Sequence, residues 1–227
     1  MSLLKIQNIS KMYRQGEVEV NALTDINLTF EKSEFAALVG PSGSGKTTLL
    51  NLIGGLDSPT SGKIFLNDTD LSALNEQDLS QFRLFKIGFI FQAYNLVPVL
   101  SALENVELVM VLQNTPASER RERALHYLNL VGLNDMIHRR PSALSGGQQQ
   151  RVAVARALAA GPKLVLADEP TANLDSENAS ALLDIMFNLA KEEETTFVFS
   201  THDARVMERA ERIITLHDGS IKSDKAV

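Results

Sequence analysis

The chain has 227 residues, of which 44% are hydrophobic and 22% charged, and this composition supports a folded core rather than a disordered chain. It contains no cysteine, which excludes a disulfide scaffold, a thiolate metal site and a cysteine nucleophile. A net charge of −6 with only 6% aromatic residues argues against nucleic-acid binding, so we expect no nucleic acid among its partners.

The spacing of apolar residues predicts an α/β fold. In segments 4–9, 18–20 and 26–30, apolar and polar residues alternate, which predicts half-exposed antiparallel strands. Segment 35–39 is apolar throughout and is typical of a parallel strand buried on both faces. Further strands are predicted at 63–66, 86–91, 164–167, 196–200 and 212–216, and helices at 48–53, 117–131, 148–160 and 178–190. Strands that alternate with helices indicate a parallel sheet, and the helix-rich middle, 101–160, is predicted to be a lobe inserted into this core.

The strand at 35–39 runs into a glycine-rich loop with the pattern G-x-x-x-x-G-K-[ST]. Its glycines let backbone N–H groups turn inward around phosphate oxygens. Lys46 supplies a positive charge for the β- and γ-phosphates, and the Thr47 hydroxyl can bind Mg²⁺. The helix that follows directs its positive N-terminus at the anion. The residues predicted to hold the nucleotide phosphates are Gly40, Pro41, Ser42, Gly43, Ser44, Gly45, Lys46, Thr47 and Thr48.

Two adjacent carboxylates end the apolar strand at 164–167. The carboxyl end of a buried parallel strand is where α/β sheets bind ligands. Asp168 is therefore predicted to hold Mg²⁺, directly or through water, and Glu169 to polarise the attacking water. A pair of exposed strand-end acids is the alternative, which the phosphate loop in the same chain disfavours.

A third motif, LSGGQ at 144–148, opens a helix. Ser145 is a good N-cap, and the two glycines expose backbone N–H groups that could bind a second anion. On residues alone, an ordinary capped helix remains the alternative. Adjacent glycines weaken a helix start, however, and a tolerated weakness of this kind is typical of a functional segment.

The chain resembles the ATP-binding-cassette (ABC) ATPases over essentially its whole length. Segment 144–148 is similar to the signature motif of that family, and the two phosphate-site motifs flank it in the family's order. Segment 91–93 resembles the Q-loop, 172–175 the D-loop and 200–203 the switch-histidine segment. Tyr13 matches the aromatic residue that stacks on adenine.

The resemblance implies a P-loop NTPase (RecA-like) parallel-sheet core with an N-terminal antiparallel β subdomain and an inserted α-helical subdomain. We expect one ABC ATPase domain over 1–227, with 1–92 and 161–227 forming the nucleotide-binding core and β subdomain and 93–160 the helical subdomain.

The implied cofactors are ATP and Mg²⁺, and the implied reaction is ATP hydrolysis. Thr47, Gln92 and Asp168 are expected to hold Mg²⁺. Glu169 is expected to act as the general base, assisted by His202, with Lys46 and Gln92 completing the catalytic set. The resemblance assigns Ser145, Gly146, Gly147, Gln148 and Asp175 to the nucleotide of a second copy, in a head-to-tail ATP-sandwich dimer.

Within the family, segments 88–98, 103–108 and 167–175 are similar to the ATPase subunits of lipoprotein-releasing and macrolide-export transporters. No stretch reaches the roughly 20 apolar residues that cross a bilayer, and the start turns polar too soon for a secretory signal. We therefore expect a peripheral protein on the cytoplasmic face of the inner membrane, bound through the surface around 94–107 to an integral-membrane permease that it energises.

The alternative of the same family is an ATPase that drives cell-division or envelope-remodelling machinery without transport. DNA-repair and translation ABC proteins are disfavoured because this compact acidic chain shows no tandem cassette or basic arm. A kinase or GTPase would leave segment 144–148 without a role. The transported substrate is not readable from these residues.

Overall fold

The computed structural model describes residues 2–16 and 18–227, which pack as two compact units. The first unit contains the described residues up to Arg83 together with Thr196–Val227, and the second contains Leu84–Thr195. The chain therefore leaves the first unit once and returns to it for its last strands. The division into a core and a helical subdomain at 93–160 stays a prediction.

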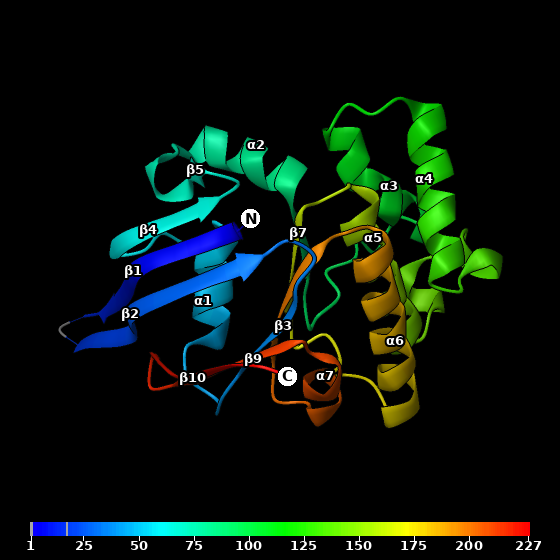
Figure 1. Cartoon of the computed structure of the whole chain (residues 1–227). Coiled ribbons are helices and arrows are strands. Elements are labelled where there is room, and N and C mark those ends of the chain that lie inside the picture. Colours follow the sequence, from blue (N-terminus) through cyan, green and yellow to red (C-terminus); the bar gives the residue numbers. More distant parts are fainter. Residues whose placement is uncertain (1, 17) are drawn as a thin grey trace. The chain divides into compact units, whose positions relative to one another are not determined.

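The first unit contains an antiparallel sheet with the strand order β2-β1-β4-β5. Its strands are β1 (Ser2–Gln15), β2 (Val18–Glu31), β4 (Ser61–Leu66) and β5 (Thr69–Asp70). The sequence predicts two short strands where β2 runs unbroken. Register shifts along the β1–β2 ladder explain the difference, for example between Lys11 and Met12, which pair with Leu23 and Asn21, because each bulge interrupts the alternation of apolar and polar residues. Figure 1 shows β1, β2 and β4 side by side.

A second set of strands in this unit has the order β10-β9-β3-β8. The strands are β3 (Phe35–Val39), β8 (Thr196–Thr201), β9 (Arg212–His217) and β10 (Ser220–Ala226). β3 runs parallel to both β8 and β9, as its continuous apolar run predicts. Phe35 packs against both Phe197 and Phe199, at ring-centroid distances of 5.8 and 4.5 Å, and all three rings are fully buried. This aromatic cluster fixes the strand that leads into the phosphate loop.

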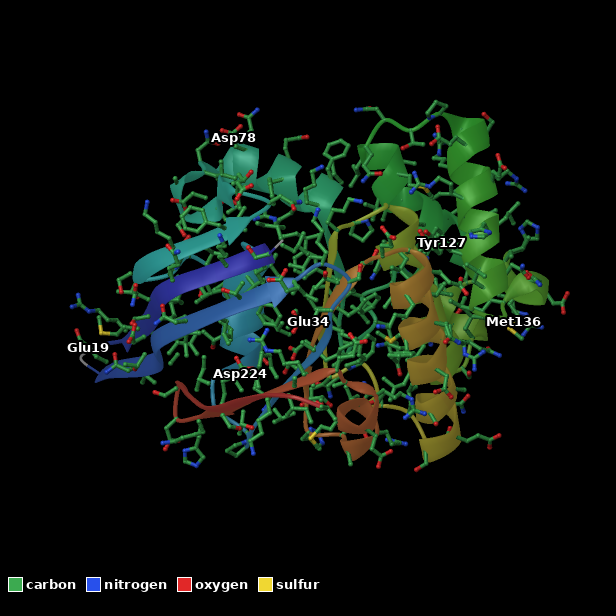
Figure 2. All side chains as sticks on the ribbon, in the orientation of Figure 1. Glu19, Glu34, Asp78, Tyr127, Met136 and Asp224 are labelled. Atoms are coloured by element: carbon green, nitrogen blue, oxygen red, sulfur yellow. The ribbon has the colours of Figure 1, made fainter. Side chains whose placement is uncertain are left out.

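Short helices complete the first unit. These are α1 (Lys46–Ile53), the 3-10 turn Leu71–Ala73, α2 (Glu76–Lys86), which runs into the second unit, and α7 (Ala204–Arg209). An ion-pair network connects β9 to its neighbours. Arg212 on β9 donates hydrogen bonds to Asp224 on β10 and to Glu34, which precedes β3; both acidic residues are labelled in Figure 2. The hydrogen bonds that Arg212 donates to Asp224 and Glu34 outweigh partial burial and raise the pKa of Arg212.

The second unit is built around two parallel strands and four helices. β6 (Ile87–Ile90) pairs with β7 (Leu164–Asp168). The helices are α3 (Ala102–Leu112), α4 (Ala117–Leu130), α5 (Gly146–Ala159) and α6 (Ser176–Glu192), with 3-10 turns at Asn134–Met136 and Pro141–Ala143. α5 packs against α3, α4 and α6, and Figure 1 shows α5 and α6 next to each other. Because α5 is the central helix of this unit, its side chains can reach several loops at once.

The predicted α/β fold with parallel and antiparallel parts is confirmed. Over the described residues, none of the helices combines the length and apolarity needed to cross a membrane.

Candidate functional site

The glycine-rich loop connects β3 to α1 in the first unit. α1 begins at Lys46, so Lys46, Thr47 and Thr48 form its first turn. Gly45 is the N-cap with φ +101, a left-handed conformation that side chains rarely adopt. A Cβ at Gly45 would also lie 2.7 Å from the Ala22 carbonyl oxygen. Glycine is therefore required at this position by both backbone conformation and space.

The side chain of Lys46 lies against the loop that precedes α1. It is folded back so that Nζ donates hydrogen bonds to the carbonyl oxygens of Gly40, at 2.8 Å, and Pro41, at 3.1 Å. The residue is only 8% exposed, which is unusual for a lysine. Ser44 Oγ is buried in the same loop and has no hydrogen-bond partner among the residues that the structure describes. A buried cation and an unpartnered hydroxyl in one loop fit an anion such as a nucleotide phosphate.

The turn between β9 and β10 supports this loop, a feature that the sequence analysis missed. The Ser44 carbonyl oxygen accepts a hydrogen bond from the Gly219 N–H at 3.1 Å, and the Gly219 carbonyl oxygen accepts one from the Thr24 N–H at 2.8 Å. Asp218-Gly219 is a strong hairpin signal in the sequence. That signal locates a turn, but not the loop that the turn contacts.

Tyr13 on β1 lies beside the start of α1. Its hydroxyl donates to Asp57 Oδ2 at 2.7 Å, and Lys11 Nζ donates to Asp57 Oδ1 at 2.7 Å while lying 4.8 Å from the centroid of the Tyr13 ring. Burial, followed by the hydrogen bond and charge of Asp57, raises the pKa of Tyr13, and a hydrogen bond with Thr48 opposes this shift. The structure thus brings Tyr13 to the first turn of α1.

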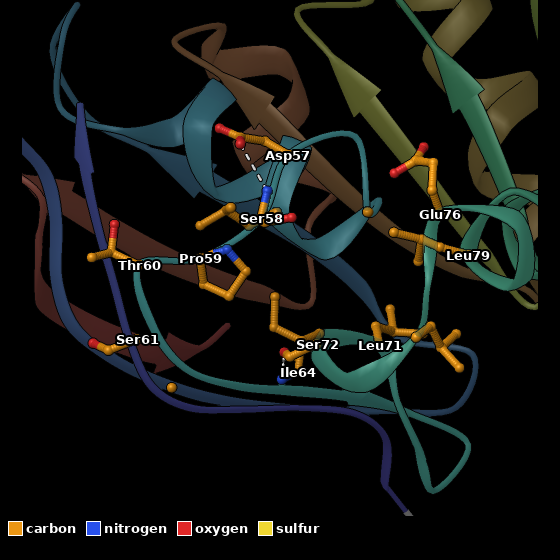
Figure 3. Close-up of a pocket in the computed structure, with 14 residues that line it drawn as sticks. Asp57, Ser58, Pro59, Thr60, Ser61, Ile64, Leu71, Ser72, Glu76 and Leu79 are labelled. Atoms are coloured by element: carbon orange, nitrogen blue, oxygen red, sulfur yellow. Dashed lines mark hydrogen bonds between the residues drawn. The ribbon is translucent and has the colours of Figure 1, made fainter. Parts of the chain in front are cut away.

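Asp57 is the anchor of this cluster and was not predicted. Partial burial alone would raise its pKa, but the hydrogen bonds from Lys11, Tyr13 and the Ser58 N–H lower it below the ordinary value. Asp57 also borders a cavity of about 210 Å³ in the first unit. Figure 3 shows Asp57 and Ser58 on one side of it and Leu71 on another. None of the residues that line this cavity is a predicted site residue.

His202 follows β8 directly and is exposed. Because β3 and β8 are parallel and Val39 pairs with Thr201, Gly40 and His202 leave the sheet at the same edge. The first unit therefore brings the phosphate loop and the predicted switch histidine together.

Asp168 and Glu169 lie in the second unit, where β7 ends. Asp168 is the last residue of the strand, and Glu169 follows with φ +45, a left-handed conformation that is uncommon for glutamate. The backbone therefore leaves the β-strand conformation at Glu169. Contacts other than strand pairing must fix the position of the residues that follow.

The predicted signature segment forms the N-terminus of α5. Ser145 is the N-cap, and its hydroxyl accepts from the Gln148 N–H while the Gln148 side chain accepts from the Ser145 N–H. A Cβ on Gly146 would lie 2.8 Å from the hydroxyl of Tyr94, and one on Gly147 would lie 3.5 Å from the side chain of Asn178. The two glycines thus allow the helix start to approach both the Gln92 segment and α6.

Side chains hold the segment that carries Gln92. The carbonyl oxygen of Gln92 accepts from Asn173 Nδ2 at 2.9 Å. Tyr94 and Asn95 both have positive φ, and Arg156 of α5 donates to both of their carbonyl oxygens. Burial lowers the pKa of Arg156. Because the segment forms no strand or helix here, these side-chain bonds define its course.

Asp175 is the N-cap of α6. It accepts from the Asn178 N–H at 2.9 Å and from Asn178 Nδ2 at 2.6 Å, and the backbone bond followed by the side-chain bond lowers its pKa. The second unit therefore brings together the predicted signature, Q-loop and D-loop segments.

Comparison with known proteins decides the family. The profile of the ABC transporter family matches residues 23–172. The chain is also 44% identical to the lipoprotein-releasing system ATP-binding protein LolD of Legionella pneumophila, over 96% of this chain and 96% of that protein. The chain belongs to the ABC transporter family. The predicted resemblance to this family and to its lipoprotein-release and macrolide-export group is thereby confirmed.

Other ABC relatives agree over nearly the whole chain. An uncharacterized ABC transporter ATP-binding protein of Thermotoga maritima is 46% identical over 97% of this chain and 94% of that protein. The macrolide export ATP-binding/permease protein MacB of Brucella melitensis is 45% identical over 98% of this chain, which covers 34% of MacB. A solved dimeric ATP-binding cassette in a post-hydrolysis state, bound to ADP and Pi, is 43% identical, with a TM-score of 0.91 and 98% of each chain covered. This ABC chain therefore has the P-loop NTPase fold that the sequence predicts.

Proposed function

We propose that this ABC chain binds ATP with Mg²⁺, hydrolyses it, and thereby energises a membrane permease of the lipoprotein-release or macrolide-export type. The observation that carries the proposal is the buried ammonium of Lys46 within a loop that also holds the unpartnered Ser44 hydroxyl. Among the described residues, the Lys46 ammonium donates hydrogen bonds to two loop carbonyl oxygens, and the Ser44 hydroxyl has no partner, so the loop can offer charge and a hydroxyl to a bound phosphate.

Residues of the first unit would bind the nucleotide. Tyr13, held by Asp57, presents an aromatic face on which adenine can stack. The segment 40–48 contributes the phosphate loop, with Lys46 neutralising charge on the β- and γ-phosphates. His202, which leaves the sheet at the same edge as Gly40, would donate a hydrogen bond to the γ-phosphate.

Thr47, Gln92 and Asp168 would hold Mg²⁺. The described residues contain no group of three or more His, Asp or Glu side chains that could bind a metal alone, so this small oxygen donor set needs phosphate oxygens to complete it. When bound, the ion neutralises charge on the phosphates. Glu169 would accept the proton of the attacking water, and positioning does the rest of the catalytic work.

A second copy of the chain would complete each site. Ser145, Gly146, Gly147 and Gln148 present a helix N-terminus, which suits an anion, and Asp175 lies next to them through Asn178. Two solved structures of one relative are dimeric, which supports a head-to-tail ATP-sandwich dimer with a two-fold interface.

The permease would dock on the surface around 94–107. Val99 is 69% exposed, a large value for an apolar residue in a well-packed unit. A permease partner would place this protein peripherally on the cytoplasmic face of the membrane. The names of the relatives, for lipoprotein release and macrolide export, favour this function over the non-transport alternative in division or envelope remodelling.

Release of inorganic phosphate from ATP by the purified full chain tests the proposal. We expect turnover that requires Mg²⁺ and disappears in Lys46→Ala prepared in parallel, which controls for contaminating ATPases. No magnesium-dependent release, even with the permease supplied, would refute the proposed function.

A further inference from the structure

Gln150 of α5 holds the backbone next to two predicted catalytic residues. Its side chain is fully buried, and Nε2 donates to the Pro170 carbonyl oxygen at 2.9 Å and to the Phe91 carbonyl oxygen at 3.4 Å. Phe91 immediately precedes Gln92, and Pro170 immediately follows Glu169. A single amide group on the central helix of the second unit thus joins the segments that carry the metal ligand Gln92 and the general base Glu169.

The backbone at both acceptors has left regular structure. β6 ends at Ile90, one residue before Phe91, and β7 ends at Asp168, two residues before Pro170. Glu169 between them has a left-handed backbone. Past the ends of the two strands, no strand ladder fixes the spacing between the two segments, and the Gln150 amide spans it.

The other half of the amide is unsatisfied. Gln150 Oε1 is buried and has no hydrogen-bond partner in the described structure. If the amide were rotated by half a turn, Oε1 would face the Phe91 and Pro170 carbonyl oxygens, which cannot donate a hydrogen bond. These two acceptors therefore fix the orientation of the Gln150 amide. An unsatisfied buried oxygen weakens a fold, and an apolar side chain of the same size would avoid that cost. That side chain would, however, leave the Phe91 and Pro170 carbonyl oxygens without this donor, so the favourable contribution of the glutamine is its two bonds to the backbone beside predicted site residues.

We propose that Gln150 is a positioning residue for ATP hydrolysis, which sets the separation of Gln92 and Glu169 through the Phe91 and Pro170 carbonyl groups. The inference rests on the proposed function of the chain. A second hydrogen bond joins the same two segments, because Asn173, four residues after Glu169, donates to the Gln92 carbonyl oxygen. This bond supports the role proposed for Gln150.

Gln150→Met tests the proposal, because methionine keeps the volume and removes both the donor and the unsatisfied oxygen. Gln113→Met is a matched control. Gln113 Nε2 also donates to two backbone carbonyl oxygens from separate segments, Leu84 at 2.9 Å and Ala160 at 3.1 Å, but neither adjoins a predicted site residue.

In the full chain, we expect Gln150→Met to lower kcat for ATP at least about tenfold, a change of one decade per 1.4 kcal/mol of transition-state stabilisation. Its Kd for ATP should stay within about twofold of wild type, and its Tm should not fall below that of Gln113→Met, which should keep wild-type kcat. A residue with only a structural role would lose kcat in step with Tm.

Three outcomes would overturn the inference: unchanged kcat in Gln150→Met, an equal loss of kcat in Gln113→Met, or loss of ATP affinity as large as the loss of kcat. If Gln150→Met does not fold, Gln150→Leu takes its place, and failure of both to fold assigns Gln150 to folding and refutes the positioning role. A wild-type chain without magnesium-dependent turnover would instead refute the proposed function, so the two failures are distinguishable.

Discussion

Replacing Asp57 tests how the proposed adenine-binding side of the site is held in place. Its two carboxylate oxygens accept from Tyr13 Oη and Lys11 Nζ, both at 2.7 Å. Asp57→Asn removes the charge and turns one acceptor oxygen into a donor, so one of the two bonds must be lost and the other weakened. We expect both a less stable protein and weaker ATP binding.

The magnitude follows from the burial of the cluster. Hydrogen bonds to charged groups contribute about 1.5–3 kcal/mol each, and exposed ion pairs contribute about 0–1 kcal/mol. The Lys11 side chain is 12% exposed and that of Asp57 31%, so solvent screens the pair in part. We therefore expect Asp57→Asn to lower the free energy of unfolding by about 1–2 kcal/mol at pH 7.

The loss of unfolding free energy in Asp57→Asn should become smaller as the pH falls. The folded protein holds the pKa of Asp57 below its ordinary value of 3.8, so the ionised carboxylate stabilises the fold above that value. This contribution disappears as the pH falls through the lowered pKa. The gap between wild type and Asp57→Asn should therefore narrow between about pH 5 and pH 3.

Urea unfolding across this pH range measures the gap, with Asp68→Asn as the control. Asp68 is exposed in the β4–β5 turn at φ +64, a conformation that asparagine also adopts, so this variant should match wild type. ATP binding to Asp57→Asn should weaken about threefold to tenfold, because Tyr13 loses its hydroxyl anchor. Equal stability at pH 7, or a loss that stays constant down to pH 3, would contradict the role assigned to Asp57.

Three further substitutions probe the glycine-rich loop and the proposed docking surface. Lys46→Ala should raise the Kd for ATP by about two decades in calorimetric titration, since the loop loses its buried charge; unchanged affinity would contradict the phosphate-loop assignment. Gly45→Ala should destabilise the chain by about 2 kcal/mol or more, because alanine meets the Ala22 carbonyl oxygen at φ +101, and wild-type stability in thermal unfolding would refute this. Val99→Asp should leave the ATPase activity of the isolated chain intact and reduce its co-purification with the permease, and full assembly would exclude Val99 from the interface.

The proposed docking surface is better probed at Val99 than at Glu104. Glu104 forms a capping box with Ser101 at the start of α3, and this hydrogen bonding lowers the pKa of Glu104. Reversing its charge would remove the cap as well as change the surface. An effect on assembly would then have two explanations.

The sequence predicts the elements whose side chains follow a clear period. β3, β7 and β8 were predicted to within one residue because they are buried runs, and the glycine-rich loop follows β3 as expected. α2 was missed because only Leu79 among its residues is buried, so it carries no apolar stripe. β10 was missed for a similar reason, since it is polar and mostly exposed.

The supporting residues of the site could not be predicted, because their partners are distant in sequence. Asp57 lies 44 residues from Tyr13, and Gln150 lies 59 residues from Phe91. A motif identifies residues that meet a ligand. It contains no information on the side chains that hold those residues in position. Asp57 meets Tyr13 only because β1 packs beside α1, and Gln150 meets Phe91 only because α5 packs beside the Gln92 segment.

The mass of Glu169→Gln in saturating ATP and Mg²⁺ tests the central claim most directly. If a pair of chains encloses ATP and Glu169 removes the proton from water, this variant should bind ATP, release no phosphate and elute with light scattering at twice the 24.9 kDa of one chain. The wild type under the same conditions should turn over and return to the single-chain mass. A Glu169→Gln variant that binds ATP but stays at the mass of one chain, or that hydrolyses ATP at the wild-type rate, would contradict the account.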